Sequence, residues 1–230
     1  MIHIGETQVN LGMPNAKVLY FGETKMGPII GESSSPSPSK PLEQWDRVDG
    51  KGTVVGFWTD KNGTRYAVVV ADAAYRTGGQ KWGPTKVNTP LPNYADFSSK
   101  ALAAGESATF NMDTIRGKYD LTTYPAFNSA YSKTITFGGV TYNGLLPNAS
   151  ELKMINDNKS DLDLLDITLS DYSNNSLMTW NIEGKSGYCW TSTEEDLNYA
   201  WLVSSGGNVS SNGKNNSAGV IPIFEIPLED

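Results

Sequence analysis

The sequence predicts an α+β fold in which two helices and an antiparallel sheet with long loops form one domain. Two segments, 122–133 and 147–158, carry the capping residues and apolar spacing of helices. Four segments with strand-favouring or alternating side chains follow, at 177–182, 187–193, 198–205 and 219–226. The 23 glycines and 12 prolines supply the many turns that short strands need. Helices followed by an antiparallel meander are typical of α+β proteins rather than α/β proteins.

Residues 1–31 are predicted to form a small β-hairpin arm in front of this domain. HIGETQV (3–9) and YFGETKM (20–26) place apolar residues around the same Gly-Glu-Thr, so we expect them to pair. An isolated hairpin is marginal in water, which favours docking on a partner over a swapped or frayed arm. Residues 32–41 are rich in Ser and Pro and predict an extended linker. Residues 42–230 then form the main domain.

The main domain opens with a predicted β-hairpin. TVVGFWT (53–59) and TRYAVVVAD (64–72) flank Asn62-Gly63, which supplies the positive φ angles that a tight turn requires. The following stretch, 75–108, is rich in Gly and Pro and predicts a long packed loop.

Two helices are expected next, with room for a short continuation after the second. The helix 122–133 is entered through Thr122 or Thr123, and the helix 147–158 is capped by Asn148 or Ser150. The segment SDLDLLDITL, 160–169, is compatible with a short continuing helix capped by Ser160.

Aromatic residues alternate along the predicted strands. Tyr188 and Trp190 share one strand face, and Tyr199 and Trp201 share a face of the next strand. This alternation favours a core position for both tryptophans. Cys189, the only cysteine, can form no internal disulfide, and a buried hydrophobic position is favoured for it.

The amino-acid composition and charge argue against several classes of function. The formal net charge is -7, with acidic residues concentrated in 151–171, where a solvated acidic face is favoured. Such a charge disfavours nucleic acid and anionic lipid as partners. No apolar run approaches the ~20 residues of a membrane span, and MIHIGETQVN lacks the features of a secretory signal.

Catalytic motifs are sparse. The only histidine, His3, lies in the arm, so the main domain cannot assemble a Ser-His-Asp or Cys-His site. Phosphate-loop and dinucleotide fingerprints are absent, and the sequence predicts no cofactor and no metal site. Paired carboxylates of the glycosidase type stay open, because their separation depends on the fold.

The candidate binding site is a polar stretch between strands, 204–217, together with the turn 194–199. Amides, hydroxyls, one cation and an aromatic ring are concentrated there, and such a composition is typical of adaptable binding surfaces. The alternative is a soluble turn region without a ligand, because Asn-Gly and Gly-Gly are ordinary turn residues. The candidate ligand-binding residues are Asn198, Tyr199, Asn208, Ser210, Asn212, Lys214, Asn215 and Asn216.

Two stretches resemble the C-type-lectin-like proteins of gut-bacterial surfaces and of their phages. The first is GLLPNASELKMI, and the second runs from GYCWTSTEED through AWLVSSGGNV to KNNSAGVIPI. The matching pieces are Leu146-Pro147 to Leu152, Trp190 to Glu194, Ala200-Trp201, Gly207 to Val209 and Lys214 to Asn216, within residues 50–226. The ending VIPIFEI departs from the family pattern, in which Arg flanks the final Val-Pro.

The resemblance implies a C-type-lectin-like fold that displays ligand-binding loops in its second half. Calcium-binding relatives carry Glu-Pro-Asn or Gln-Pro-Asp with Trp-Asn-Asp, and none of these occurs here. The formylglycine-generating oxidases, the enzymes among the relatives, use a cysteine pair, whereas Cys189 stands alone.

The expected function is therefore non-enzymatic. The favoured hypothesis is a phage virion accessory, fibre or decoration protein, whose arm docks on a capsid or tail protein and whose lectin-like domain binds host-surface glycan or protein. A bacterial cell-surface adhesin is the alternative, and a formylglycine-generating-type enzyme comes third. Assembly as a homo-oligomer and retroelement diversification of the C-terminal loops stay open.

Overall fold

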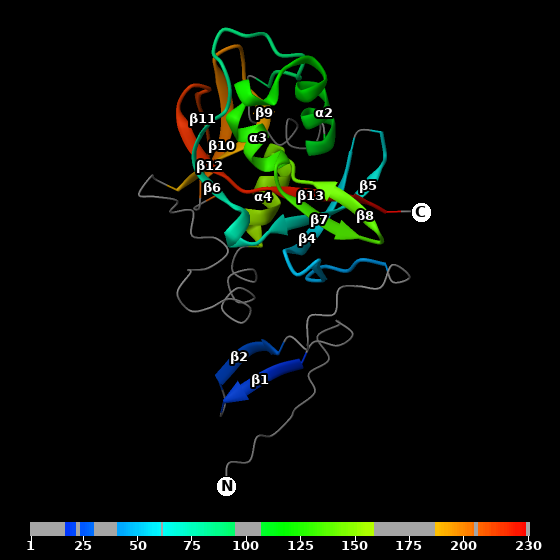
Figure 1. Ribbon diagram of the computed structural model, residues 1–230. Coiled ribbons are helices and arrows are strands. Elements are labelled where there is room, and N and C mark those ends of the chain that lie inside the picture. Colours follow the sequence, from blue (N-terminus) through cyan, green and yellow to red (C-terminus); the bar gives the residue numbers. More distant parts are fainter. Residues whose placement is uncertain are drawn as a thin grey trace.

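The computed structural model describes residues 17–21, 24–29, 41–60, 62–94, 107–158, 187–204 and 207–228 (Figure 1). Its helices and mostly antiparallel strands confirm the α+β class. The predicted helix 160–169 and strand 177–182 lie outside the described residues, as does the predicted linker apart from Pro41.

The described elements are three α-helices, two short 3-10 helices and four sheets. The helices are α2 (Ala108–Lys118), α3 (Pro125–Tyr131), α4 (Ala149–Asp157), η1 (Ala73–Tyr75) and η2 (Leu121–Thr123). One sheet, in the order β13-β5-β4-β3, contains β3 (Arg47–Val48), β4 (Gly52–Thr59), β5 (Arg65–Ala71) and β13 (Ile223–Pro227). Another, in the order β11-β10-β9-β12-β6, contains β6 (Thr77–Lys81), β9 (Tyr188–Glu194), β10 (Tyr199–Ser204), β11 (Val209–Gly213) and β12 (Ser217–Val220). Two hairpins complete the set: β1 (Lys17–Phe21) with β2 (Thr24–Ile29), and β7 (Thr134–Phe137) with β8 (Val140–Asn143).

Both faces of the four-stranded sheet are buried, which explains its continuous apolar runs. Val68 and Val70 of β5 belong to the main core, whereas Val69 and Ala71 belong to a second cluster on the other face. The hairpin β7–β8, which the sequence patterns did not predict, packs on that second cluster through Phe137 and Tyr142. The sheet is therefore a central layer between two groups of side chains.

The hairpin predicted at 53–72 is confirmed as β4 and β5. Its turn differs from the expectation, because Gly63 has a positive φ of 86° and Asn62 does not. The Asp60 carboxylate instead accepts hydrogen bonds from the backbone N–H of Asn62 (2.8 Å) and Thr64 (2.9 Å). An aspartate that bonds its own turn in this way replaces the second positive φ.

The five-stranded sheet corrects the predicted meander. Strands β9, β10 and β11 are antiparallel as predicted, but β12 runs parallel to β9. The single strand predicted at 219–226 is wrong, because it divides into β12 and β13, which belong to different sheets. Pro222 lies between them and has no N–H to continue a ladder. The last strand consequently lies beside β5, near the start of the domain.

Helix α4 agrees with its local signals. Asn148 caps it, accepting a hydrogen bond from Glu151 N–H, while the Glu151 carboxylate accepts one from Asn148 N–H. The helix predicted at 122–133 is shorter: Thr122 and Thr123 belong to η2, and α3 begins at Pro125.

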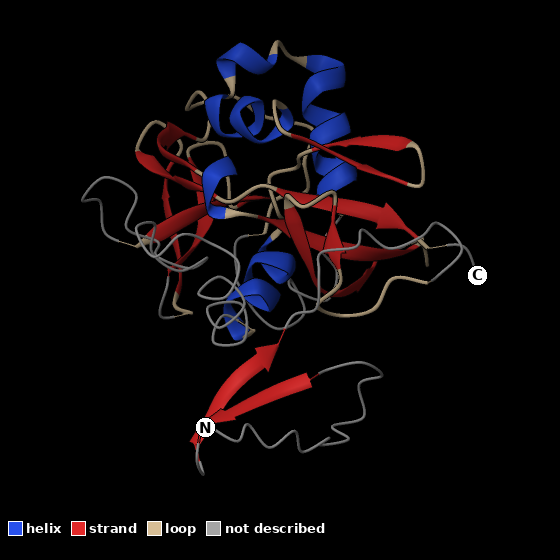
Figure 2. Cartoon of the chain, turned by 60° about the horizontal axis from the view of Figure 1, so that its bottom comes forward, coloured by secondary structure: helices blue, strands red, loops and turns tan. Residues whose placement is uncertain are grey.

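Helix α2 is an element that the sequence patterns did not predict. Ser107 caps it by accepting a hydrogen bond from Phe110 N–H. The helix follows the stretch 75–108, which is itself not loop throughout, because it contains β6. In Figures 1 and 2, α2 and α3 lie together at one end of the domain, while α4 packs against β4, β9 and β10.

The N-terminal segment contains a hairpin, but not the predicted one. Phe21 pairs with Thr24 and Lys17 with Ile29, so the chain reverses inside 20–26, where one strand is expected. Residues 3–9, its predicted partner, lie outside the described part of the chain.

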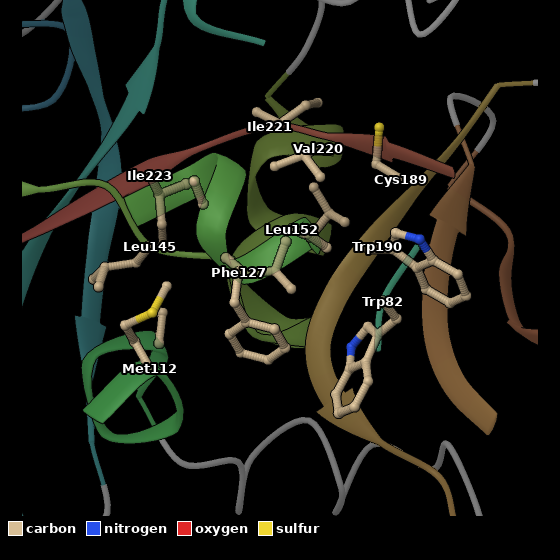
Figure 3. Packing of buried hydrophobic residues seen from close by; sticks show 14 of the residues in the cluster. Trp82, Met112, Phe127, Leu145, Leu152, Cys189, Trp190, Val220, Ile221 and Ile223 are labelled. Atoms are coloured by element: carbon tan, nitrogen blue, oxygen red, sulfur yellow. The ribbon is translucent and has the colours of Figure 1, made fainter. Parts of the chain in front are cut away.

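One large core joins both main sheets to the three helices (Figure 3). Met112, Phe127 and Leu152, one from each helix, belong to the same cluster as Trp190. Trp190 is fully buried and Trp201 is 8% exposed, which confirms both as core residues. Cys189 is also fully buried, and burial raises the pKa of its thiol far above the ordinary value.

Candidate functional site

Two turns lie side by side at one end of the five-stranded sheet. Turn 194–199 joins β9 to β10, and turn 213–216 joins β11 to β12. Tyr199 pairs with Gly213, and Lys214 N–H donates to the Asn198 carbonyl (2.8 Å). The two turns thus form one surface, although 14 positions separate Tyr199 from Gly213 in the sequence.

The loop 82–94 packs on both turns. Lys86 N–H donates to the Leu197 carbonyl (3.0 Å), and Gly83 N–H donates to the Lys214 carbonyl (3.2 Å). We call residues 82–94, 194–199 and 213–216 the turn face.

The turn face exposes apolar and amide side chains together. Leu197 is 43% exposed and Tyr199 is 46% exposed, and both belong to turn 194–199. Asn215 and Asn216 are exposed on the neighbouring turn, with side-chain atoms 3.1 and 3.3 Å from the position that a Cβ at Gly213 would take. Since Gly213 is the partner of Tyr199, the two amides lie close to the tyrosine backbone.

The conformation of turn 194–199 is fixed by Asp196. Its carboxylate accepts hydrogen bonds from the backbone N–H of Asn198 (2.7 Å) and of Tyr199 (2.9 Å). An aspartate that bonds its own turn holds the backbone in place. Leu197 and Tyr199 are therefore displayed from an ordered turn.

Lys214 is fully buried beneath the turn face and forms an ion pair with Glu194. Its Nζ lies 4.8 Å from the centroid of the Trp82 ring, a cation–π distance. The Glu194 carboxylate also accepts a hydrogen bond from the Thr89 hydroxyl (2.5 Å). This buried cluster connects all three segments of the turn face.

The ion pair is made at a desolvation cost. Burial raises the pKa of Glu194 and lowers the pKa of Lys214, because each charge has left water. The attraction between the two charges opposes both pKa shifts, and the hydrogen bond from Thr89 also opposes the pKa shift of Glu194. Each charge therefore depends on the other, which locks the turns and the loop into one arrangement.

The structure brings five of the predicted site residues together, buries Lys214 beneath them and places the other two apart. Asn198, Tyr199, Asn212, Asn215 and Asn216 lie at the turn-face end of the sheet. The Asn212 side chain accepts a hydrogen bond from the Asn216 amide (2.6 Å), so these two residues brace the turn as well.

Asn208 and Ser210 lie toward the other end of β11. The strand runs from Val209 to Gly213, a rise of about 13 Å at the usual spacing of a β-strand. A small ligand on the turn face would therefore not reach Asn208.

Two predictions about this region are wrong. Lys214 is 0% exposed, so it offers no cation to a ligand at the surface. The stretch 204–217 is not one loop, because residues 209–213 form β11, hydrogen-bonded to β10. The polar residues of this stretch are accounted for by an edge strand and its turn, which need no apolar side chains on their exposed side.

A groove of about 570 Å³ opens between α2, η2 and α3. Its lining residues are Asp113, Arg116, Gly117, Tyr119, Leu121 and Tyr131. The Tyr119 hydroxyl donates to the Asn88 carbonyl (3.1 Å) in loop 82–94, so the groove borders the turn face. No residue of this groove is among the predicted site residues.

Comparison with known proteins assigns no family to the chain. No protein-family model matches it, and a search of the curated proteins found no match. Within the described residues, no helix is long and apolar enough to cross a membrane. In the same part of the chain, His, Cys, Asp and Glu side chains form no group of three or more that could hold a metal ion. Function must therefore be argued from the site itself.

Sequence patterns missed Glu194, Thr89 and Trp82 as the anchors of the turn face. No local signal marks them, since Lys214 and Glu194 are 20 positions apart. A lone lysine in a polar stretch is ordinarily solvated. Only the fold shows that this one points inward.

Proposed function

We propose that the chain is a non-enzymatic recognition protein, a phage virion accessory or fibre subunit that binds host-surface glycan or protein through the turn face. The observation that carries the proposal is the exposed group Leu197, Tyr199, Asn215 and Asn216, on turns anchored by a buried ion pair. Aromatic and amide side chains on a rigid backbone are suited to binding, because little conformational entropy is lost when a ligand docks.

The proposal includes a C-type-lectin-like fold for residues 42–230. Its support is that the resembling motifs occupy regular elements of the structure. Pro147 directly precedes the Asn148 cap of α4, Trp190 is on β9, and Ala200-Trp201 is on β10. The Lys-Asn-Asn motif, 214–216, forms the turn between β11 and β12.

The N-terminal hairpin would dock the subunit on a capsid or tail protein, and the Ser/Pro segment would space the domain from the particle. Mass spectrometry of density-purified particles tests this directly, and we expect the chain to be present. Absence from the particles, with recovery from the envelopes of uninfected bacteria, would contradict the virion location and favour the bacterial adhesin instead.

The recognition role is tested by the double variant Tyr199→Ala with Asn215→Ala. Both side chains are exposed, so the melting temperature should change little, because surface substitutions usually stay within about 0.5 kcal/mol. Binding of the labelled protein to the bacterial strain that propagates the particles should weaken.

The matched control is Val140→Ala with Asn128→Ala, which removes one exposed apolar and one exposed amide side chain outside the turn face. Equal binding by both double variants and the unchanged protein would contradict a ligand on the turn face.

A further inference from the structure

We propose that the groove between α2, η2 and α3 is a second binding site, and that its ligand is a neutral saccharide. Its volume of about 570 Å³ falls within the range of about 300–1,000 Å³ that is usual for small-ligand sites. The site stands on its own residues, on helices rather than on the turn face, and does not rest on the function proposed above.

Gly117 keeps this groove open. A glycine inside a helix destabilises it relative to alanine, and Gly117 lies within α2. No atom lies within 4 Å of a Cβ built at this position, so packing does not require a glycine. Its φ is not among the positive values of the described residues, so the backbone does not require one either. What the glycine provides is free space on the groove wall.

The two charged side chains that line the groove have opposite signs. Arg116 Nε donates to the Asp113 carboxylate (2.8 Å), and the two side chains remain 48% and 56% exposed. A ligand with a net charge would meet one attractive and one repulsive partner side by side. Neighbouring hydroxyl groups suit the pair better, because one can donate to the carboxylate while the next accepts from the guanidinium.

Two half-buried tyrosines supply the apolar part of the site, and both are held by their hydroxyl groups. The Tyr131 hydroxyl accepts a hydrogen bond from Arg116 Nη1 (2.8 Å), and the Tyr119 hydroxyl donates to Asn88 (3.1 Å). Both rings are partly covered, because the Arg116 guanidinium lies 5.4 Å from the Tyr131 ring centroid and Lys118 Nζ lies 5.5 Å from the Tyr119 ring centroid. The ring surface that remains beside Leu121 is apolar and lies next to the polar pair.

A pyranose ring has both features that this surface complements, an apolar C–H face and an edge of adjacent hydroxyls. A nucleotide or an acidic peptide would bring negative charge against Asp113 and would use only part of the site. The combination of Asp113, Arg116 and two tyrosines therefore points to a neutral sugar rather than to a charged ligand.

The test is a titration of the full chain with maltose, lactose and cellobiose, followed by amide resonances in nuclear magnetic resonance spectra. We expect saturable shifts for at least one sugar at residues 116–121 and 131, with turns 194–199 and 213–216 unaffected. Gly117→Leu, which fills the groove with a good helix former, should weaken that binding by about tenfold or more.

Asn128→Leu is the matched control, because it adds the same side chain to an exposed helix position outside the groove. It should bind as the unchanged protein does, and both variants should unfold cooperatively. Absence of shifts in the groove for all three sugars would overturn the proposal, as would equal weakening by Asn128→Leu. Tighter binding of N-acetylneuraminic acid than of any neutral sugar would overturn the neutral class.

The outcomes separate this site from the turn face. Loss of host-cell binding in the double variant Tyr199→Ala with Asn215→Ala, without sugar binding in the groove, would leave the proposed function intact and reject the groove. Sugar binding in the groove, with unchanged host-cell binding by that double variant, would support the groove and reject the turn face as the host-binding site.

Discussion

Two buried acidic sites in this domain are neutralised by different means. At one, Glu194 is paired with Lys214 beneath the turn face. At the other, Glu225 of β13 meets the N-terminus of α2 and a second carboxyl, Glu151 of α4. The first site needs a partner side chain and the second needs a proton. The first should therefore respond mainly to mutation, and the second should respond to pH.

The Glu225 carboxylate acts as a remote cap for α2. Its two oxygens accept hydrogen bonds from the backbone N–H groups of Ala108 and Thr109, both at 2.9 Å. The first N–H groups of a helix lack partners within the helix and carry partial positive charge, so a carboxylate satisfies both needs. A residue close to the C-terminal end thereby fixes where α2 begins.

Glu151 is the partner that holds its proton more tightly. It is 0% exposed, and Asn148 N–H donates to one of its oxygens (2.7 Å). Burial first, and then the charge and hydrogen bond of Glu225, raise the pKa of Glu151 well above its ordinary value. The solvated acidic face expected for 151–171 is therefore wrong at Glu151, although the Lys153–Asp157 pair of the same helix is exposed.

The largest effect is expected for Lys214→Met. The substitution leaves the Glu194 charge buried without its cation, and breaking a buried pair in this way costs about 3–5 kcal/mol. Denaturant unfolding at neutral pH measures the change. We also expect faster amide exchange in turn 213–216, because its anchor is lost.

The double variant with Lys214→Met and Glu194→Gln sharpens this prediction. It removes the uncompensated charge while the new amide can still accept a hydrogen bond from Thr89, so much of the lost stability should return. A single variant as stable as the unchanged protein would mean that the ion pair does not anchor the turn face.

A smaller loss, of about 2 kcal/mol, is expected for Glu225→Gln. The amide keeps one acceptor for Ala108 or Thr109 and turns a donor toward the other, leaving a buried N–H unsatisfied. Thermal unfolding measures the loss of stability, and amide exchange at the start of α2 shows whether the loss is located there. Glu43→Gln, at an exposed position, is the control and should change the free energy of unfolding very little. Equal effects of the two substitutions would contradict the capping role.

The two sites also show which features of the structure could be predicted from the sequence. The Asn148–Glu151 capping box is a local pattern, so α4 could be predicted from the sequence. Helix α2 could also have been predicted, because Ala108, Met112 and Ile115 follow Ser107 at helical spacing. Partners distant in sequence leave no such local mark.

The contact of Glu225 with Ala108 spans 117 positions, and that of Lys214 with Glu194 spans 20. Chain folding, rather than any local pattern, brings these residues together. The groove was missed for the same reason, because its lining comes from three separate elements.

The smallest change is expected for Glu151→Gln near pH 5, where the effect should stay below about 1 kcal/mol. The glutamine side chain copies a protonated glutamate, since it can accept from Asn148 and donate to Glu225. In the unfolded chain Glu151 titrates near its ordinary value of 4.5, whereas the folded protein holds the proton more tightly. The stabilisation is therefore complete below that ordinary value, falls as the pH rises above it, and is lost once the pH passes the raised pKa.

The pH dependence of the Glu151→Gln variant completes this prediction. The amide that replaces the carboxyl keeps its hydrogens at every pH, so the variant should become more stable than the unchanged protein as the pH rises. The gain should reach up to about 1.4 kcal/mol per pH unit between the ordinary and the raised pKa of Glu151. Parallel curves of unfolding free energy against pH for the two proteins would show that Glu151 does not hold the proton, and the contrast between the two buried sites would have to be abandoned.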